Sequence, residues 1–303
     1  MIRRTMKPPA FSYARPTSLE EALLMLSENG PDARILAGGQ SLIPMLSLRL
    51  ARPALLVDLA RIPALDGIEL GNDSVSISCM VRESQAERSE ALLRRIPILR
   101  DTLPLIGHEA IRNRGTLVGS LCHADPAAEL PAVALALDAV VIARSSAGGT
   151  RRIAARDFFL GPYTTSLRED ELVTAVELAD RPWQGACFLE VSRRRGDFAM
   201  AGLAAFLTLE GGAIRRLRLS FCATGDRPTL WTEEDLQVGG LDLDDGVVEH
   251  LARVTSTALE PIADVHGSAS YKKQLAAVLV RRGLRLAQSR ARAGATAESS
   301  GAR

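Results

Sequence analysis

The chain has 303 residues, of which 47% are hydrophobic, and its 37 Lys and Arg nearly balance its 36 Asp and Glu. This length predicts about two domains, each with a sizeable core. Balanced charge gives no reason to expect nucleic acid as a partner, because nucleic acids select basic surfaces. The longest apolar stretch, residues 132–143, contains Asp138 and is too short to span a membrane.

The cysteines are widely spaced, and no two of them form a Cys-x-x-Cys pair. This spacing argues against metal ligation by this chain, either of zinc or of an iron–sulfur cluster, and it is typical of proteins in a reducing compartment. The basic start of the chain has no apolar segment after it, so no secretory signal is predicted. We therefore expect a soluble, cytoplasmic protein. The four cysteines are Cys79, Cys122, Cys187 and Cys222.

The first third of the chain alternates short strands with one clear helix. Ser18 and Glu21 have the spacing of a capping box, so a helix should begin at Leu19 and end near Gly30. Apolar runs predict strands on either side of this helix and beyond it, the last two forming a hairpin around a Gly-Asn-Asp turn. The predicted strands cover residues 11–13, 35–36, 55–59, 68–70 and 75–78.

The middle of the chain is mainly helical. Helices are predicted over residues 83–94, 97–110 and 131–138, from the helical spacing of their apolar residues. Buried strands should follow at 139–143 and 171–178, with a loop over residues 156–165 between them.

A domain boundary is expected near residues 181–183, in the sequence Arg-Pro-Trp. Beyond it, strands are predicted first and helices afterwards, an order that favours an α+β fold. The last residues are polar and are expected to form a disordered tail. The strands cover 187–192, 201–210 and 214–224, the helices 241–259 and 271–295, and the tail 296–303.

Two segments of small residues carry the functional signal. Residues 37–41 place Gly38 and Gly39 directly after an apolar run, where the backbone can turn tightly and expose its N–H groups. Successive exposed N–H groups suit an anion such as a pyrophosphate, although a Gly-Gly pair is also common in plain turns. Residues 114–120 form a second such loop, in which Thr116 and Ser120 add hydroxyl donors. Two facing loops could together hold both phosphates of a dinucleotide.

Other nucleotide-binding patterns are absent from the sequence. It contains no Gly-x-Gly-x-x-Gly and no Gly-x-x-x-x-Gly-Lys-Ser/Thr, so neither a Rossmann site nor a P-loop is supported. It also lacks a nucleophile elbow with a Ser-His-Asp order.

Five stretches resemble the FAD-binding medium subunit of molybdenum hydroxylases, the group that includes aerobic carbon monoxide dehydrogenase and the flavin subunits of xanthine dehydrogenase. The resemblance runs from about Phe11 to Ala287. The stretches are Ala-Gly-Gly-Gln-Ser-Leu-Ile-Pro at 37–44, Ile-Arg-Asn-Arg-Gly-Thr-Leu-Val-Gly-Ser at 111–120, Ala-Asp-Pro-Ala-Ala-Glu-Leu-Pro at 124–131, Arg-Gly-Asp-Phe-Ala at 195–199 and His-Gly-Ser-Ala-Ser-Tyr at 266–271.

The resemblance implies a two-part vanillyl-alcohol-oxidase-like (PCMH-type) FAD-binding domain over residues 1–178. A small domain of antiparallel sheet and helices resembling the C-terminal domain of carbon monoxide dehydrogenase flavoprotein would follow over 183–287, and then a disordered tail over 288–303. FAD would place its pyrophosphate between the two loops and its ring beside an aromatic side chain. The implied cofactor-binding residues are Ala37, Gly38, Gly39, Gln40, Ser41, Thr116, Leu117, Val118, Gly119, Ser120, Asp125, Glu129 and Phe198.

Several of these residues have structural alternatives. Asp125 could cap the helix that follows it instead of binding sugar hydroxyls, and Glu129 could be an ordinary charge in a first helical turn. Phe198 could belong to a core. Val118 departs from the family pattern, which commonly has a glycine there; its Cβ would make a positive φ costly and crowd the phosphate.

By resemblance, the chain is the flavoprotein subunit of a molybdenum hydroxylase. A large molybdopterin subunit and a small subunit with two [2Fe–2S] clusters would be its partners, in a dimer of heterotrimers. FAD would pass electrons from the near cluster to an external acceptor, so no side chain of this chain is assigned a catalytic or metal-binding role. Two alternatives remain: a stand-alone FAD oxidoreductase of this fold and a flavin-free scaffold. The substrate of the complex and the electron acceptor stay open.

Overall fold

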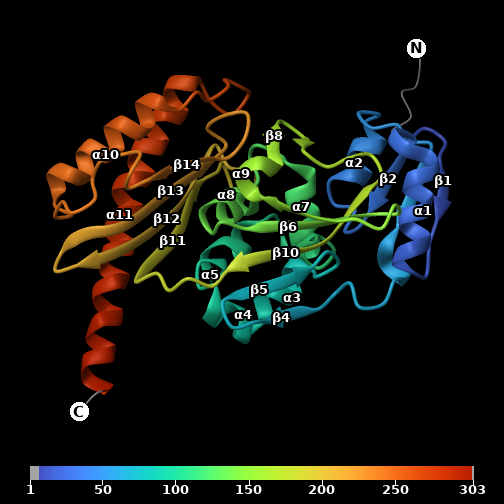
Figure 1. Cartoon of the computed structure of the whole chain (residues 1–303). Coiled ribbons are helices and arrows are strands. Elements are labelled where there is room, and N and C mark those ends of the chain that lie inside the picture. Colours follow the sequence, from blue (N-terminus) through green and yellow to red (C-terminus); the bar gives the residue numbers. More distant parts are fainter. Residues whose placement is uncertain (1–6, 302–303) are drawn as a thin grey trace.

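The computed structural model describes the backbone of residues 7–301 and the side chains of residues 7–293. Three parts follow one another along the chain and lie side by side, from the N-terminal part at the right of Figure 1 to the C-terminal part at its left. Each part is built on its own sheet. The mixture of helices with antiparallel sheets agrees with the α+β class expected from the sequence.

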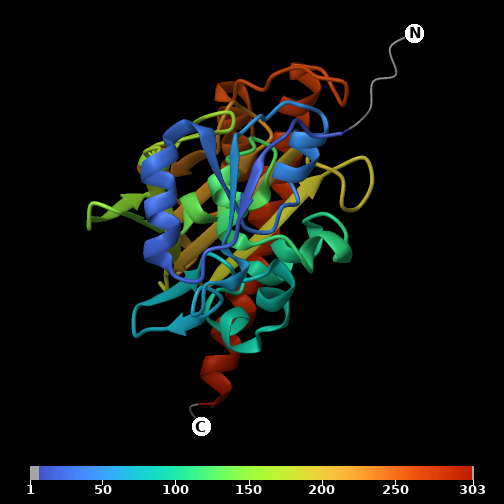
Figure 2. The ribbon, with the colours of Figure 1, turned by 90° about the vertical axis from the view of Figure 1, so that its right-hand side faces the viewer.

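The N-terminal part is a small parallel sheet with a helix against it (Figure 2). The predicted capping box is present: Ser18 Oγ accepts the N–H of Glu21 at 3.1 Å, and the Glu21 carboxylate accepts the N–H of Thr17 at 2.9 Å. The order in the sheet is β1-β3-β2, with both pairings parallel. The elements are β1 (Ser12–Ala14), α1 (Leu19–Asn29), η1 (Gly30–Asp32), β2 (Ala33–Leu36), α2 (Leu42–Ser47), β3 (Leu55–Asp58) and η2 (Leu59–Arg61).

The middle part is a five-stranded antiparallel sheet in the order β4-β5-β10-β6-β7. The expected hairpin is present as β4 (Ile68–Leu70) and β5 (Ser74–Ser78). Its other strands are β6 (Val140–Ser145), β7 (Thr150–Ala154) and β10 (Glu171–Ala179). The helices between them are α3 (Glu83–Arg88), α4 (Glu90–Arg95), α5 (Leu99–Thr102), η3 (Leu103–Leu105), α6 (Glu109–Arg112), α7 (Leu117–His123) and α8 (Glu129–Ala136).

Three sequence expectations for this part are wrong in detail. The single helix expected over 83–94 is two, because Ser89 has extended backbone and caps α4 by accepting the N–H of Leu92. The helix expected over 97–110 is interrupted near Pro104 and at Gly107, whose φ is +50°. The expected loop at 156–165 contains α9 (Ala155–Phe158) and a short pair of strands, β8 (Phe159–Gly161) and β9 (Thr164–Thr165).

The C-terminal part is a four-stranded antiparallel sheet, β11-β12-β13-β14, with α8 on one face and two long helices on the other (Figure 1). Alternate residues of a strand point to opposite faces. Phe188, Ala204 and Phe206 accordingly join the core of the N-terminal and middle parts, whereas Cys187 and Leu203 join the core under the helices. β14 was not expected from the sequence. The elements are β11 (Gly185–Val191), β12 (Ala201–Glu210), β13 (Ala213–Cys222), β14 (Thr229–Thr232), α10 (Asp245–Ala258) and α11 (Ala269–Gly301).

Helix α11 lies directly on this sheet. A Cβ at Gly185 would be 1.9 Å from the carbonyl oxygen of Ala287, so only glycine permits this approach. The helix also continues past residue 287, where the domain was expected to end: Ala291 is buried and Arg290 pairs with Asp101 at 2.5 Å. The expected disorder of 288–293 is therefore wrong. The backbone of 294–301 continues helix α11, so the expected disorder does not hold there either. Residues 302–303 lie outside the described residues, and there the disordered tail stays a prediction.

Within residues 7–301, no helix combines the length and the apolar character needed to cross a bilayer. The described part of the chain also contains no cluster of three His, Cys, Asp or Glu side chains placed to hold a metal ion.

Candidate functional site

The first predicted segment, residues 37–41, connects β2 to α2. Gly39 has a φ of +75°, a left-handed conformation that glycine adopts without the strain of a Cβ. The loop turns so that Gly39 O accepts the N–H of Ile43 at 3.1 Å, the first turn leading into α2. Within the described part of the chain, the N–H groups of Gly38, Gly39, Gln40 and Ser41 have no acceptor. Four successive donors are therefore left for a ligand.

From Thr116 onward, the second segment, residues 114–120, is the start of helix α7 and not the loop that the sequence suggested. Thr116 is its N-cap, and Thr116 Oγ1 accepts the N–H of Gly119 at 3.0 Å. Leu117 and Val118 are buried at 3% and 1% exposure, so their side chains serve the core and only their backbone can meet a ligand. Val118 lies within the helix and its φ is not positive. The strain anticipated at Val118 is thus absent.

The structure brings the two segments together, although about 80 residues of sequence separate them (their positions differ by 116 − 37 = 79). A Cβ at Gly38 would be 2.5 Å from the carbonyl oxygen of Arg114 and 2.8 Å from the Cα of Gly115. A Cβ at Gly119 would lie 3.9 Å from the Cβ of Ala37. Glycine at 38 is what allows the two backbones to touch.

Asp125, in the turn that joins α7 to α8, and Glu129, the first residue of α8, are both buried, at 9% and 7% exposure. Asp125 does not cap α8: its Oδ1 accepts the N–H of Ala127 at 2.9 Å and its Oδ2 accepts the hydroxyl of Tyr163 at 3.4 Å. Glu129 is in the first turn of α8, as one alternative had it, but it is no ordinary surface charge. Burial raises the pKa of its carboxyl to about 7, opposed by a backbone hydrogen bond and assisted by Asp125.

Phe198 lies in the connection from β11 to β12 and is 66% exposed, which excludes the alternative of a core residue. The same connection packs on the start of α6. A Cβ at Gly196, whose φ is +86°, would be 2.7 Å from the carbonyl oxygen of Gly107 and 2.8 Å from Nδ1 of His108. An exposed aromatic ring is thus held at the seam between the middle and C-terminal parts, where a planar ligand could stack on it.

Comparison with known proteins identifies the family. Residues 9–179 match the family described as "FAD binding domain in molybdopterin dehydrogenase", and residues 186–287 match "CO dehydrogenase flavoprotein C-terminal domain". The chain belongs to this flavoprotein family. The resemblance inferred from the sequence motifs is confirmed.

Three relatives match this flavoprotein over nearly the whole of both chains. Subunit alpha of the 6-hydroxypseudooxynicotine dehydrogenase complex of Paenarthrobacter nicotinovorans is 39% identical, over 95% of this chain and 97% of its own length. The carbon monoxide dehydrogenase medium chain of Hydrogenophaga pseudoflava is 34% identical, over 94% and 99%. The crystal structure of quinoline 2-oxidoreductase from Pseudomonas putida 86 superposes with a TM-score of 0.89 at 36% identity, covering 94% of this chain and 99% of that one.

The residues of this flavoprotein fit the FAD that its family binds. Four unpaired N–H groups at residues 38–41 and the N-terminus of α7 point to an anion, as a pyrophosphate requires. The glycines at 38, 39 and 119 line this region: a Cβ at 38 would clash with the backbone of 114–115, one at 39 would press on the side chains of Leu36 and Ile43, and one at 119 would clash with Thr116 Oγ1. Asp125 and Glu129 add carboxylates, which accept hydrogen bonds from hydroxyl groups.

Sequence reasoning missed several polar residues around these segments. Tyr163 contacts both Asp125 and His123, whose ring centroid is 5.1 Å from its own. Arg82 donates to the carbonyl oxygen of Arg114, and Glu83 lies under Gly115. A positive φ of 55° at Tyr163, after Gly-Pro, marks a special turn, but the sequence has no signal that pairs it with Asp125.

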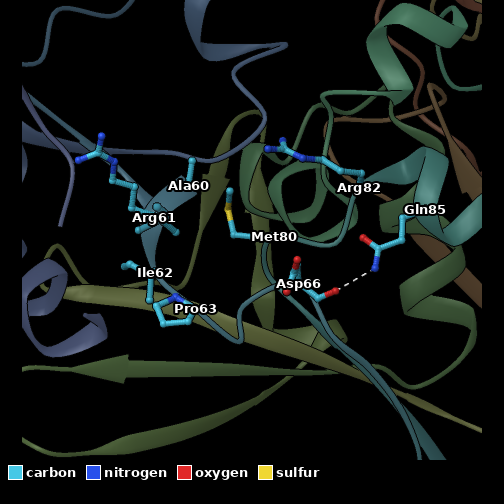
Figure 3. Close-up of a pocket in the computed structure, with 9 residues that line it drawn as sticks. Ala60, Arg61, Ile62, Pro63, Asp66, Met80, Arg82 and Gln85 are labelled. Atoms are coloured by element: carbon cyan, nitrogen blue, oxygen red, sulfur yellow. Dashed lines mark hydrogen bonds between the residues drawn. The ribbon is translucent and has the colours of Figure 1, made fainter. Parts of the chain in front are cut away.

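A hollow of about 310 Å³ lies beside these segments, between η2 and the start of α3 (Figure 3). Arg61 and Arg82 lie on opposite sides of it, with Met80 and Asp66 between them. Gln85 closes one end by donating to the backbone carbonyl of Asp66 at 2.9 Å. None of the predicted cofactor-binding residues lines this hollow, so it is separate from the paired segments.

Proposed function

We propose that this chain is the FAD-binding electron-transfer subunit of a molybdenum hydroxylase complex. The observation that carries the proposal is the meeting of residues 37–41 with 114–120, which turns two unremarkable glycine-containing segments into one anion-binding surface. Both family domains are also present, in the order and over nearly the whole length found in relatives that are named as subunits of dehydrogenase complexes.

In this proposal, FAD supplies the electron carrier between an iron–sulfur centre and an external acceptor. The residues of the chain bind and orient it. The backbone N–H groups of residues 38–41 would hold the pyrophosphate, with the first turn of α7 beside them, while Asp125 and Glu129 would hold sugar or ribityl hydroxyls. Phe198 covers one face of the ring. No acid, base or nucleophile of this chain is required.

The proposed partners are a large molybdopterin subunit and a small subunit with two [2Fe–2S] clusters, assembled as a dimer of heterotrimers. We place the entry of electrons at the junction of the middle and C-terminal parts, because the exposed aromatic side chain of Phe198 lies there. We place the complex in the cytoplasm, a proposal supported by four cysteines that are all unpaired.

The two alternatives are less well supported. The scaffold alternative rested on Val118, and the helical, buried position of that residue removes the objection to FAD binding. A stand-alone oxidoreductase would need a substrate pocket with an acid–base pair beside the ring. The hollow at Arg61 and Arg82 does not meet this need, because Phe198 and Glu129 do not line it.

The test is to purify the full chain, remove any bound flavin and titrate the apoprotein with FAD. Uptake of about one FAD per chain, with the visible absorption of a bound flavin, is expected. Lack of uptake would contradict the proposal. Co-purification of a molybdenum subunit and an iron–sulfur subunit with the tagged chain separates the complex from the stand-alone enzyme, which would be isolated alone and would oxidise a substrate by itself.

A further inference from the structure

Glu83, the first residue of α3, is a buried acid that the proposed function does not yet use. Its side chain is 4% exposed, and within the described residues its Oε2 has no hydrogen-bond partner and it forms no ion pair. Burying an unpaired carboxylate is costly, whereas burying the neutral acid is much less so. A position of this kind calls for an explanation.

The acid lies directly beneath the second segment. Glu83 N–H donates to the carbonyl oxygen of Gly115 at 3.0 Å. A Cβ at Gly115 would be 2.6 Å from Oε2 and 3.1 Å from Oε1 of Glu83. Gly115 in turn touches Gly38 on its other side. The Glu83 carboxyl, the Gly115 backbone and the Gly38 backbone thus form a stack, with the proposed pyrophosphate contacts at its edge.

The charged groups around Glu83 do not neutralise it. Arg112, from α6, lowers its pKa, but this guanidinium already pairs with Glu87 at 2.9 Å, one turn further along α3. Glu129, from α8, and Glu87 both act in the opposite direction. Burial is the largest effect, and together they raise the pKa of Glu83 to about 8. Arg82, the preceding residue, donates to the carbonyl oxygen of Arg114.

We propose that Glu83 is a positioning residue for FAD, whose neutral carboxylic acid form is required for residues 37–41 and 114–120 to bind the pyrophosphate. The inference rests on the proposed function. The physical reason is that an ionised carboxylate beneath Gly115 would place a third negative charge next to two phosphates, in a region where burial weakens screening. Ionisation would also draw water or a cation toward Gly115 and separate it from Gly38.

FAD binding and protonation of Glu83 are linked equilibria, and this linkage sets the direction in which FAD affinity changes with pH. FAD binds more tightly to the protonated form, so its affinity is constant while free Glu83 is protonated and falls as the pH rises through about 8. If FAD raises the pKa of Glu83 by one further unit, the affinity falls about tenfold at high pH. Binding at pH 8.5 then takes up about half a proton.

The experiment measures the dissociation constant of FAD from the full-chain apoprotein between pH 6 and 9.5, by quenching of flavin fluorescence. For the wild type, we expect a weakening of about tenfold above pH 7.5. In Glu83→Gln, a neutral amide of the same shape, the affinity should match the wild type at pH 7 and stay flat above 7.5. A weakening in Glu83→Gln equal to that of the wild type would overturn the proposal, and so would loss of FAD binding at pH 7 by a folded Glu83→Gln.

Glu190→Gln is the matched control. Burial, with Glu129, raises the pKa of Glu190 to about 8, and both its carboxyl oxygens lack partners within the described residues, but it lies on β11 and not under the second segment. This variant should keep the weakening above pH 7.5. We assign any change in FAD affinity below pH 7.5 to titration of Glu129, whose pKa burial raises to about 7, and we expect this change in all the variants.

Calorimetry gives a measurement that does not depend on the folding of Glu83→Gln. In Glu190→Gln at pH 8.5, FAD binding in two buffers of different ionisation enthalpy should show proton uptake, and its absence would overturn the proposal. Failure of the wild type to take up FAD at any pH would instead contradict the proposed function.

Discussion

The two segments that meet at the proposed FAD site are held in different ways. Residues 37–41 form an irregular loop whose shape depends on Gly38 and Gly39, and the N–H groups of 38–41 have no acceptor among the described residues. Residues 116–120 form the first turn of a helix, with Thr116 satisfying one N–H and two side chains locked into the core. The conformation of the first segment therefore depends on two residues that have no side chain, whereas the second segment is held by the Thr116 cap and by two side chains packed in the core.

Because of this difference, glycine is required at position 38 of the first segment, whereas a larger residue is favourable at position 118 of the second. A side chain added at Gly38 strikes backbone, which cannot move without separating the segments. The side chain of Val118 points into the core, where a larger residue than glycine is an advantage. Substitutions in the two segments test this contrast, and their expected effects on FAD affinity decrease from Gly38→Val to Val118→Gly.

The largest effect is expected for Gly38→Val. Its Cβ would be 2.5 Å from the carbonyl oxygen of Arg114, so the two segments have to separate and the N–H groups no longer converge. We expect FAD affinity to fall by about 100-fold or more, a loss of about 3 kcal/mol, with the secondary structure retained. Fluorescence titration with FAD and far-UV circular dichroism measure the two quantities. Gly149→Val is the control, since Gly149 has open space around it; normal FAD content in Gly38→Val would show that the site is misplaced.

Gly39→Ala should have a smaller effect. The new Cβ would be 3.2 Å from the side chains of Leu36 and Ile43, which can adjust, but a φ of +75° costs an L-residue about 1–2 kcal/mol. Because the strain falls on the loop that binds FAD, we expect about tenfold weaker binding. Gly211→Ala, at a φ of +61° in the β12–β13 turn, should lower stability and leave FAD affinity unchanged. Equal FAD affinities of the two variants would show that the Gly39 loop does not bind the cofactor.

Thr116→Val removes the N-cap of α7 while keeping the shape of the side chain. Loss of the bond to the Gly119 N–H costs about 1 kcal/mol, through fraying of the first helical turn. If that turn binds the pyrophosphate, FAD affinity should fall about fivefold. Thr116→Ser, which keeps the hydroxyl, should stay within twofold of the wild type by the same titration. A fivefold loss of FAD affinity in both Thr116→Val and Thr116→Ser would show that FAD binding does not depend on the hydroxyl cap of α7.

Local signals in the sequence predicted much of the fold. The capping box at Ser18 and the hairpin after Gly67 depend on neighbours within a few residues, and both are present. Long-range pairing was beyond such signals. The parallel order β1-β3-β2 and the strand β14 depend on contacts between distant segments, which periodicity does not encode.

The site divides in the same way. The glycines of residues 37–41 are conspicuous in the sequence, and the family resemblance gave them a ligand. Glu83 and Tyr163 are not conspicuous: each reaches its partner, Gly115 or Asp125, across more than 30 residues of chain (115 − 83 = 32 and 163 − 125 = 38). A buried acid in a first helical turn looks like any surface charge until the packing above it is known.

Val118→Gly should leave FAD affinity unchanged, and it is the sharpest contrast with Gly38. The variant has the glycine that the family pattern commonly has at this position. If the Val118 side chain crowded the phosphate, Val118→Gly would bind FAD more tightly than the wild type. The structure predicts no such gain, because the Val118 side chain is 1% exposed and belongs to the hydrophobic core. Removing it should cost roughly 3 kcal/mol of stability, about 2 from lost burial and about 1 from glycine in a helix. Chemical denaturation measures this loss, and Val118→Ala separates the two contributions, since alanine keeps the helix propensity. A gain in FAD affinity in Val118→Gly, beyond twofold, would show that the residue meets the phosphate after all and that the second segment is not held as its helical backbone indicates.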